Sequence, residues 1–577
     1  MKKISIYTIA LAVFLILYSL WIFSTMSQIQ MSYDESRHAA GGMVWYDYIR
    51  TVLYDGYMPF KQFINQYQQM GYNAGWFVNI DPPVDGLIRV PFYALFGPTF
   101  FSVRLMALFS AIVSGILTYL IACKITKKRP IALASTIILL MSTLFFMYTA
   151  VQALDAMPTV MTGLFWYYFT FVREPKKKYL FRLGKAEFAF TWNLFWGGLA
   201  LTAATLIKYP AALFIDLFFV LYAVYLIVNR YYQTKQVNLS LFTESGALQI
   251  AFTAIVQNLI LLAISWKWLQ YNLFENHFLE RIMYTSSNEV RDVTHDLNYL
   301  AVRFPWMGSG TWFSNLTYMI HGYLQRTAFF AIFFVFTVYL LLKKKAEEGI
   351  EDAETKKQFT IITIFFLAIY LYFSFRMSNH QIRYISYAFP LVLIGAAYGL
   401  YEMISRKWPQ RILPIFFVAV LLFAGALFVL DNWMYNKTLK DFGSQNDELL
   451  TYLESLPSPR FLLHAPGVGN IPAPSGSWYY NPDFVMFTFM RAKEGYNPFN
   501  FKQNAPLYEY PRGTANEVEQ ASAYLVNQLK GIPTTVPVYV VLYRYHEPEF
   551  YTNFGNNFLK NGFQAKNLTY WTIYYRE

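Results

Sequence analysis

The sequence predicts a polytopic α-helical membrane protein that ends in an extracytoplasmic α/β domain. Its composition is 56% hydrophobic and 20% aromatic but only 14% charged, which is more apolar than an ordinary soluble domain. Long apolar runs alternate with short clusters of lysine and arginine, so the net charge of +12 reflects membrane topology. No helix-turn-helix, zinc-finger or single-strand-binding pattern is present, and we expect no nucleic-acid partner.

Eleven apolar segments are candidates for transmembrane helices, each of which needs about 20 residues. The first, "MKKISIYTIALAVFLILYSLWIF", has a basic start and no small-residue cleavage site, which predicts a retained helix and a cytoplasmic N-terminus. The other ten are predicted near residues 101–123, 131–150, 157–172, 190–207, 210–229, 248–266, 327–342, 359–376, 384–402 and 411–431.

The loops between these segments support the assignment, because basic loops alternate with loops that lack this bias. The basic loops are "KITKKR" (124–129), "REPKKK" (173–178), "NRYYQTK" (229–235), "KKKAEEGIEDAETKK" (343–357) and "SRKWPQR" (405–411). The opposite side carries a first outer loop at 25–85, a large outer loop at 267–326 and the tail. An odd number of helices places the tail on the outer side. We therefore expect a multi-pass protein of the plasma membrane, with a transmembrane module over 1–431 and an extracytoplasmic domain over 432–577.

The tail differs in character from the rest of the chain. "VPVYVVLYRY" (536–545) predicts a buried strand, and "ANEVEQASAYLVNQL" (515–529) predicts an amphipathic helix. Its glycine-rich "HAPGVGN" (464–470) lacks the spacing of a nucleotide-binding loop, so we expect no nucleotide cofactor. Cys123 is the single cysteine, which excludes an intramolecular disulfide and a cysteine-rich metal site.

The first outer loop begins with a concentration of ionisable residues in "MSYDESRHAAGG" (31–42). Ser32 to Glu35 fits a helix-capping box, and acidic residues at a helix start complement the helix dipole. Alternatively, Asp34 acts as a base toward an acceptor, while Arg37, one helical turn along, holds an anionic leaving group. Both interpretations remain open at this point.

Further ionisable residues fall in the other predicted outer loops. Asp155 in "AVQALDAMPT" either caps the next helix or faces the same site as Asp34. Lys208 in "TLIKYPAAL" either extends to the membrane surface or binds an anion. The remaining candidates are His277 and Arg281 in "NHFLER", and Arg383 and Tyr384 in "SNHQIRYISYAFP". Cations on the outer side depart from the positive-inside trend, which favours anion binding by Lys208, Arg281 and Arg383.

The order of these motifs resembles the polytopic GT-C glycosyltransferases, in particular glycosyltransferase family 39, which contains protein O-mannosyltransferases and the aminoarabinose transferases of lipid A. "DESRHA" resembles the family's DE-T/S-R-Y-A start, and "DPPVDGLIRVPFYALFG" resembles its Pro-Pro segment. Arg104 and Leu105 match an R-L-P-S helix. "LDAMPT", "TLIKYP", "NHFLER" and "RYISYAFP" are similar to the later motifs in order, so the resemblance spans residues 1 to about 402.

The resemblance implies inverting transfer of a sugar from a polyprenyl-phosphate donor to a protein, lipid or polysaccharide acceptor on the outer face. Asp34 would be the catalytic base. Glu35 and Asp155 would orient substrates or hold a divalent metal ion. The cations and polar groups that would bind the donor phosphate are Arg37, Lys208, His277, Arg281, Arg383 and Tyr384.

Two positions depart from the family pattern. Asp81 stands where His or Lys normally precedes Pro-Pro, and Tyr209 stands where Gly is usual. An acidic Asp81 cannot hold a phosphate directly, so it either joins Asp34 in binding a cation or marks a different sugar or acceptor.

The alternative is a membrane transporter or a flippase for the lipid carrier. This hypothesis predicts charged residues in the middle of the membrane-spanning segments and paired repeats in the sequence. A third hypothesis is a non-catalytic scaffold. The presence of Asp34 and Asp155 disfavours this hypothesis. The local motifs do not distinguish the sugars or the acceptor classes.

Overall fold

The structure is a computed structural model. It describes residues 5–26, 33–69, 83–146, 149, 155–183, 186–208, 210–237, 240–270, 333–343, 349–350, 352–375, 386–407, 461–464, 537–543, 555–569 and 571–577, with isolated positions between 418 and 535. The chain divides into two compact units. Unit 1 comprises Met1–Ser24 and Leu105–Trp433, and unit 2 comprises Thr25–Arg104 and Met434–Glu577.

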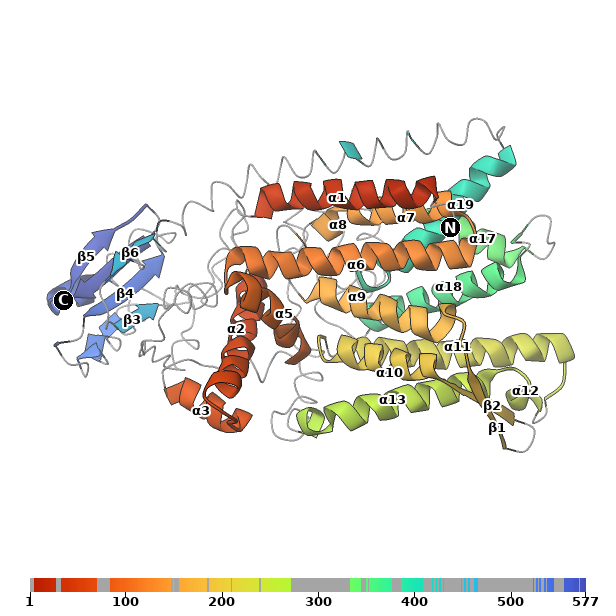
Figure 1. Ribbon diagram of the computed structural model, residues 1–577, viewed down its shortest axis with the longest axis horizontal. Coiled ribbons are helices and arrows are strands. Elements are labelled where there is room, and N and C mark those ends of the chain that lie inside the picture. The colour runs from red at the N-terminus through yellow and green to blue at the C-terminus, as the bar shows by residue number, and fades with distance from the viewer. Residues whose placement is uncertain are drawn as a thin grey trace. The chain divides into compact units, whose positions relative to one another are not determined.

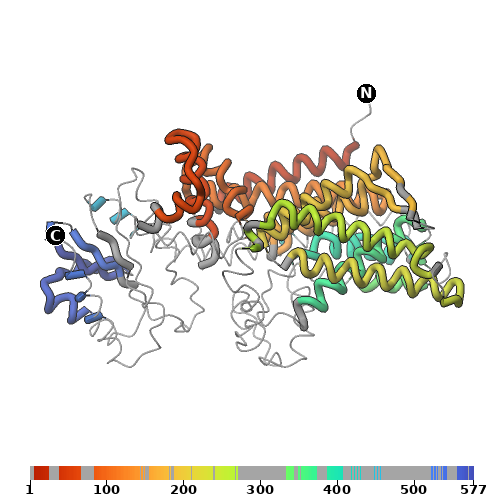
Figure 2. The backbone as a smooth tube through the Cα atoms, turned by 90° about the horizontal axis from the view of Figure 1, so that it is seen from below, coloured from red at the N-terminus to blue at the C-terminus, as the bar shows by residue number. Residues whose placement is uncertain are grey.

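Unit 1 consists mainly of helices that run side by side (Figures 1 and 2). They are α1 (Ile6–Met26), α6 (Phe100–Thr126), α7 (Arg129–Leu140), α8 (Thr143–Phe146), α9 (Ala156–Tyr167) with the π-helix η2 (Tyr168–Val172), α10 (Trp192–Thr205), α11 (Pro210–Thr234), α12 (Ser240–Thr243), α13 (Ala247–Gln270), α17 (Phe333–Leu342), α18 (Ala353–Phe375) and α19 (Phe389–Lys407). Residues 100–104 of α6 belong to unit 2.

The first ten predicted transmembrane segments each overlap a helix among the described residues. Four helices of that part of the chain are long and apolar enough to cross a membrane: Ile6–Ser24, Phe101–Thr126, Ala211–Thr234 and Ala247–Trp266. The eleventh predicted segment, 411–431, lies almost entirely outside the described residues, so the total stays a prediction. The helical, multi-pass character is confirmed.

Close helix contacts and internal hydrogen bonds hold unit 1 together. On α6, a Cβ at Gly115 would lie 2.8 Å from Cδ1 of Leu140 on α7, so glycine lets these two helices pack closely. The buried Gln257 of α13 accepts a hydrogen bond from the Trp166 indole at 2.9 Å and donates one to Thr170 at 3.0 Å. These bonds satisfy polar groups that would otherwise be costly in an apolar interior.

The predicted basic loops meet at one end of unit 1. Lys127, after α6, pairs with Asp352, before α18, at 2.7 Å. Lys128 pairs with Glu402 of α19 at 3.0 Å. The Thr355 hydroxyl donates to the Ile125 carbonyl at 2.8 Å. Loops that are far apart in sequence therefore share one end, as the alternation of charge predicted.

A two-stranded hairpin lies next to these loops. Strand β1 (Lys178–Leu183) pairs antiparallel with β2 (Ala186–Thr191), which leads directly into α10. Asn193 of α10 donates a hydrogen bond at 2.6 Å to the carbonyl of Arg173, just after η2. The end of η2 and the start of α10 are thereby held at the same end of the unit.

Unit 2 contains three helices from the first predicted outer loop: α2 (Tyr33–Tyr54), α3 (Phe60–Gln69) and α5 (Pro83–Phe96). Trp45 of α2 stacks on Phe60 of α3, with ring centroids 4.5 Å apart, and the Tyr48 hydroxyl donates to the Met58 carbonyl at 3.1 Å. Aromatic contacts therefore fold α3 back against α2.

The described part of the tail forms a four-stranded sheet in the order β3-β4-β6-β5. Its strands are β3 (Phe461–His464), β4 (Val538–Tyr543), β5 (Gln564–Asn567) and β6 (Trp571–Arg576). The strand predicted at 536–545 is confirmed as β4, which pairs with β3 in parallel and with β6 antiparallel. Of the predicted helix at 515–529, only a few positions are described, and those are helical.

Candidate functional site

The first candidate residues stand at the start of α2. Asp34, Glu35 and Arg37 lie in the first two turns, because the helix begins at Tyr33. Positions 34 and 37 are three residues apart and share one face of the helix. Their side chains lie outside the part of the chain that the structure describes, as do the residues His277, Arg281, Arg383 and Tyr384.

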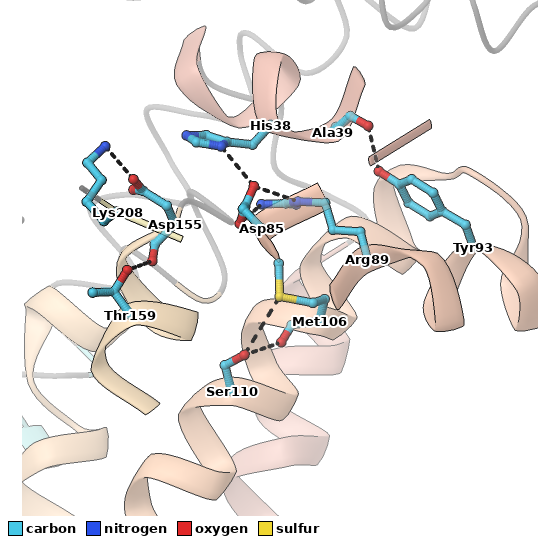
Figure 3. Close-up of polar contacts among 10 residues, drawn as sticks. All are labelled: His38, Ala39, Asp85, Arg89, Tyr93, Met106, Ser110, Asp155, Thr159 and Lys208. Carbon is cyan, nitrogen blue, oxygen red and sulfur yellow. Dashed lines mark hydrogen bonds and ion pairs between the residues drawn. The ribbon is translucent and has the colours of Figure 1, made fainter. Parts of the chain in front are cut away.

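The structure brings two other candidates, Asp155 and Lys208, into direct contact. Asp155 immediately precedes α9, and Lys208 lies between α10 and α11. The Lys208 ammonium forms an ion pair with Oδ2 of Asp155 (Figure 3). The Asp155 side chain is 1% exposed and the Lys208 side chain 17% exposed, so water weakens this attraction less than it would on the surface.

This contact bears on the structural alternatives that the sequence left open for the two residues, capping for Asp155 and extension to the membrane surface for Lys208. The Asp155 side chain makes no capping hydrogen bond to α9, so the capping interpretation is wrong. The first turn is closed by the backbone N–H of Thr159, which donates to the Asp155 carbonyl at 3.0 Å, and the Thr159 hydroxyl donates to the same carbonyl at 2.6 Å. Lys208 is mostly buried against a carboxylate and does not simply extend to the membrane surface.

Asp155 directly precedes α9, and the start of this helix lies at the end of unit 1 opposite the loop between α6 and α7 (Figure 1). From Asp155, α9 and η2 run to Arg173, next to Glu174, which pairs with Lys124 at 2.7 Å. Among the described residues, the buried pair thus lies at one end of unit 1 and the clustered basic charges lie at the other. The carboxylate can accept a hydrogen bond, and the ammonium can attract an anion.

A second polar cluster links α2 to α5 within unit 2. His38 Nδ1 lies 2.9 Å from Asp85 Oδ2, and Arg89 places Nε and Nη2 3.3 Å from the two Asp85 oxygens (Figure 3). All three residues are at most 2% exposed. The Tyr93 hydroxyl donates to the Ala39 carbonyl at 2.9 Å beside them.

The ionisation of Asp85 depends on these neighbours. Burial alone raises its pKa, but the charges of Arg89 and His38 and their hydrogen bonds outweigh burial and hold the pKa below its usual range. Asp85 is therefore a carboxylate at neutral pH. It lies on α5, which is not one of the candidate membrane spans.

The sequence interpretation missed this cluster. Asp85 and Arg89 are four residues apart on one helix, a spacing typical of an ion pair, so the pattern was visible. The third member, His38, comes from another helix. No sequence spacing indicates which carboxylate it meets.

Among the residues that the structure describes, no group of three or more His, Cys, Asp and Glu residues could hold a metal ion. The Asp155 carboxylate is occupied by an ammonium, which is a poor setting for a cation. The proposed divalent metal ion thus depends on Asp34, Glu35 and Asp81, whose side chains lie outside that part of the chain.

Comparison with solved structures first defines the class of fold. ArnT from Cupriavidus metallidurans in the apo state matches with a TM-score of 0.56 and 13% identity, and the match covers 99% of this chain and 98% of that one. The same protein bound to undecaprenyl phosphate matches with a TM-score of 0.53 and 14% identity over the same shares. The chain therefore shares the helical fold of ArnT, in agreement with the fold class that its motif order predicted.

A family comparison narrows this class. Residues 68–282 match the family model described as dolichyl-phosphate-mannose-protein mannosyltransferase. The region contains Asp85, Asp155 and Lys208. No curated protein sequence matches the chain.

Proposed function

We propose that this protein is an inverting glycosyltransferase that moves a sugar from a polyprenyl-phosphate carrier to an acceptor on the outer face of the cell membrane. The observation that carries the proposal is the buried Asp155–Lys208 pair at the end of unit 1 away from the basic loops. The family match over residues 68–282 and the fold shared with ArnT, which has been seen with undecaprenyl phosphate, support it.

The chemistry requires a base on one side of the sugar and cations on the other. Asp34 removes the proton from the acceptor hydroxyl, whose oxygen attacks the anomeric carbon. The bond from that carbon to the phosphate oxygen breaks, and the polyprenyl phosphate leaves with the electron pair. A single displacement of this kind inverts the anomeric configuration.

The leaving phosphate gains negative charge as its bond to the sugar breaks. Fixed cations therefore stabilise the transition state more than the bound donor, which lowers the barrier. Lys208 is the described cation best suited to this role, because Asp155 holds its ammonium in a sheltered position. The proposal assigns the same role to Arg37, His277, Arg281, Arg383 and Tyr384.

Asp155 then has a supporting role. Its carboxylate keeps Lys208 oriented before the donor arrives, and together with Glu35 it orients the donor or the acceptor. A divalent metal ion held by Asp34, Glu35 or Asp81 would neutralise part of the phosphate charge in addition.

Release of polyprenyl phosphate tests the proposal directly. The full chain in nanodiscs is supplied with polyprenyl-phosphate mannose, glucose, galactose, arabinose or aminoarabinose, together with a membrane extract that contains acceptors. We expect release with at least one donor and its loss in Asp34→Asn. Asp352→Asn is the matched control, because it makes the same change at an exposed carboxylate in the basic loops.

Two further measurements distinguish a metal-dependent from a metal-independent transferase, and a transferase from a flippase or transporter. Loss of activity on addition of a chelator, and recovery with Mg²⁺ or Mn²⁺, would assign a metal ion to the site. Donor movement between leaflets without any release would favour the flippase or transporter. Equal activity of wild type and Asp34→Asn would remove Asp34 from the mechanism.

A further inference from the structure

The contact between α2 and α5 is organised around buried charge. Oδ2 of Asp85 on α5 lies 2.9 Å from Nδ1 of His38 on α2. The same oxygen lies 3.3 Å from Nε of Arg89, which is on α5 as well (Figure 3). None of the three side chains is more than 2% exposed. A carboxylate removed from water in this way is stable only while its partners remain in place.

This dependence makes the cluster selective for one orientation of α2. Rotation of α2 about its axis would withdraw His38 and leave Asp85 with an incomplete set of partners. A buried ion pair is weak evidence for overall stability, because its desolvation cost is high, but it penalises every arrangement that breaks it. We therefore expect the cluster to restrict the rotation of α2 about its axis more than it strengthens the packing of α2 against α5.

The surrounding contacts fix the distance between the same two helices. A Cβ at Gly42 would lie 2.8 Å from Cδ of Arg89, so this glycine lets α2 approach the arginine closely. The Tyr93 hydroxyl donates to the Ala39 carbonyl at 2.9 Å. Close packing and one neutral hydrogen bond thus hold the two helices together beside the charged cluster of His38, Asp85 and Arg89.

The rotation of α2 matters because of the residues in its first turns. Asp34 lies four residues before His38, which is one helical turn and the same helix face. Arg37 directly precedes His38. A change in the angle of α2 at His38 therefore moves both positions.

We propose that Asp85 is a positioning residue for the transfer reaction: by holding His38, it fixes the rotation of the helix that presents Asp34 and Arg37 to the substrates. This inference rests on the proposed function for the role of Asp34. The physical claim, that Asp85 orders the first turns of α2, is independent of any activity.

Hydrogen exchange tests the physical claim on the full chain in nanodiscs. Asp85→Asn preserves the shape of the side chain and removes its charge. We expect amides of residues 33–40 to exchange at least tenfold faster in Asp85→Asn, with residues 46–54 unchanged. Tyr93→Phe, which removes only the neutral hydrogen bond between the same helices, is the matched control and should show a much smaller change. Unchanged exchange at 33–40 in Asp85→Asn would overturn the proposal.

Kinetics then test the link to catalysis. Misplacement of a base by about 1 Å costs about 100-fold in rate. We expect kcat for donor turnover to fall 10- to 100-fold in Asp85→Asn, with KM for the donor within threefold of wild type. An equal fall of kcat in Tyr93→Phe would show that the cluster only attaches the helices, and would overturn the positioning role.

A second, milder variant tests the same proposal in case Asp85→Asn does not fold. His38→Gln retains a hydrogen-bond donor toward Asp85 but cannot carry charge, and we expect the same pattern in milder form. If wild type turns over no donor, the proposed function fails while the exchange experiment still decides the role of Asp85. If wild type is active and exchange at 33–40 is insensitive to both variants, only the positioning role fails.

Discussion

The ammonium of Lys208 forms an ion pair with the carboxylate of Asp155, although the two residues flank different helices. Both side chains are largely shielded from water, so neither can lose its partner without cost. The pair also places a cation at the end of unit 1 where few other charges are described. Its energetic and catalytic roles can be separated by substitution.

Replacement of Lys208 should destabilise the protein and also inactivate it. Lys208→Gln leaves Asp155 buried without its ammonium, which costs about 3 kcal/mol, and removes a cation from the leaving phosphate, which costs about 100-fold in kcat. The double variant Asp155→Asn with Lys208→Gln should recover the thermal midpoint but not the activity. Both quantities are measured on purified protein in nanodiscs.

Lys124→Gln is the matched control for this pair. Its partner Glu174 is 82% exposed, and exposed pairs contribute at most about 1 kcal/mol. We expect both thermal midpoint and activity near wild type. Recovery of activity in the double variant would contradict the role of Lys208 in catalysis.

Larger residues at the glycines between α2 and α5 should destabilise unit 2. The Cβ of Gly86→Ala would overlap the Trp45 ring, which is itself stacked on Phe60 and has little room to move. Overpacking of this kind costs about 1–3 kcal/mol. The thermal midpoint of the full chain checks this expectation.

Gly163→Ala provides the comparison for that substitution. A Cβ at Gly163 meets nothing within 4 Å, and Ala favours a helix interior over Gly by about 1 kcal/mol. We expect an unchanged or slightly higher midpoint. A fall equal to that of Gly86→Ala would mean that helix glycines matter for reasons other than close packing.

Acid should weaken unit 2 through Asp85. Because its pKa is lower in the folded protein than in the unfolded chain, the stabilisation is fully present above the unfolded pKa of about 4 and is lost as pH falls toward the folded pKa. One such group changes the free energy of unfolding by at most about 1.4 kcal/mol per pH unit. The thermal midpoint between pH 5 and pH 3 should therefore fall more steeply in wild type than in Asp85→Asn. Parallel curves would show that other carboxylates dominate acid unfolding.

Cysteine labelling should establish the orientation in the membrane. The single native cysteine allows a clean background in Cys123→Ser. In intact cells we expect an impermeant maleimide to label Tyr57→Cys, in the first outer loop, but to label Lys177→Cys, beside the basic hairpin, only after lysis. Both native residues are exposed, so access to the side chain itself is not limiting. The reverse pattern would place the Asp155–Lys208 end in the cytoplasm and exclude an outer-face reaction.

Much of the architecture could be predicted because it depends on local properties of the chain. Apolar length predicted the helices of unit 1, and the alternation of basic loops predicted that the loop with Lys127 and Lys128 would share one end with the loop that contains Asp352. A continuous apolar run of mostly β-branched and aromatic residues predicted β4 as a buried strand. The site was predicted less completely, since Asp155 and Lys208 were both chosen but neither as the partner of the other.

The sequence by itself determined the class of the protein, because membrane insertion depends on hydrophobicity and charge counted along the chain, and because a family's motifs keep their order. Only the tertiary structure decided which charges meet. A buried carboxylate needs a counter-charge, and the packing of α9 beside α10 and of α2 against α5 determines whether Lys208 or His38 is near enough to supply one.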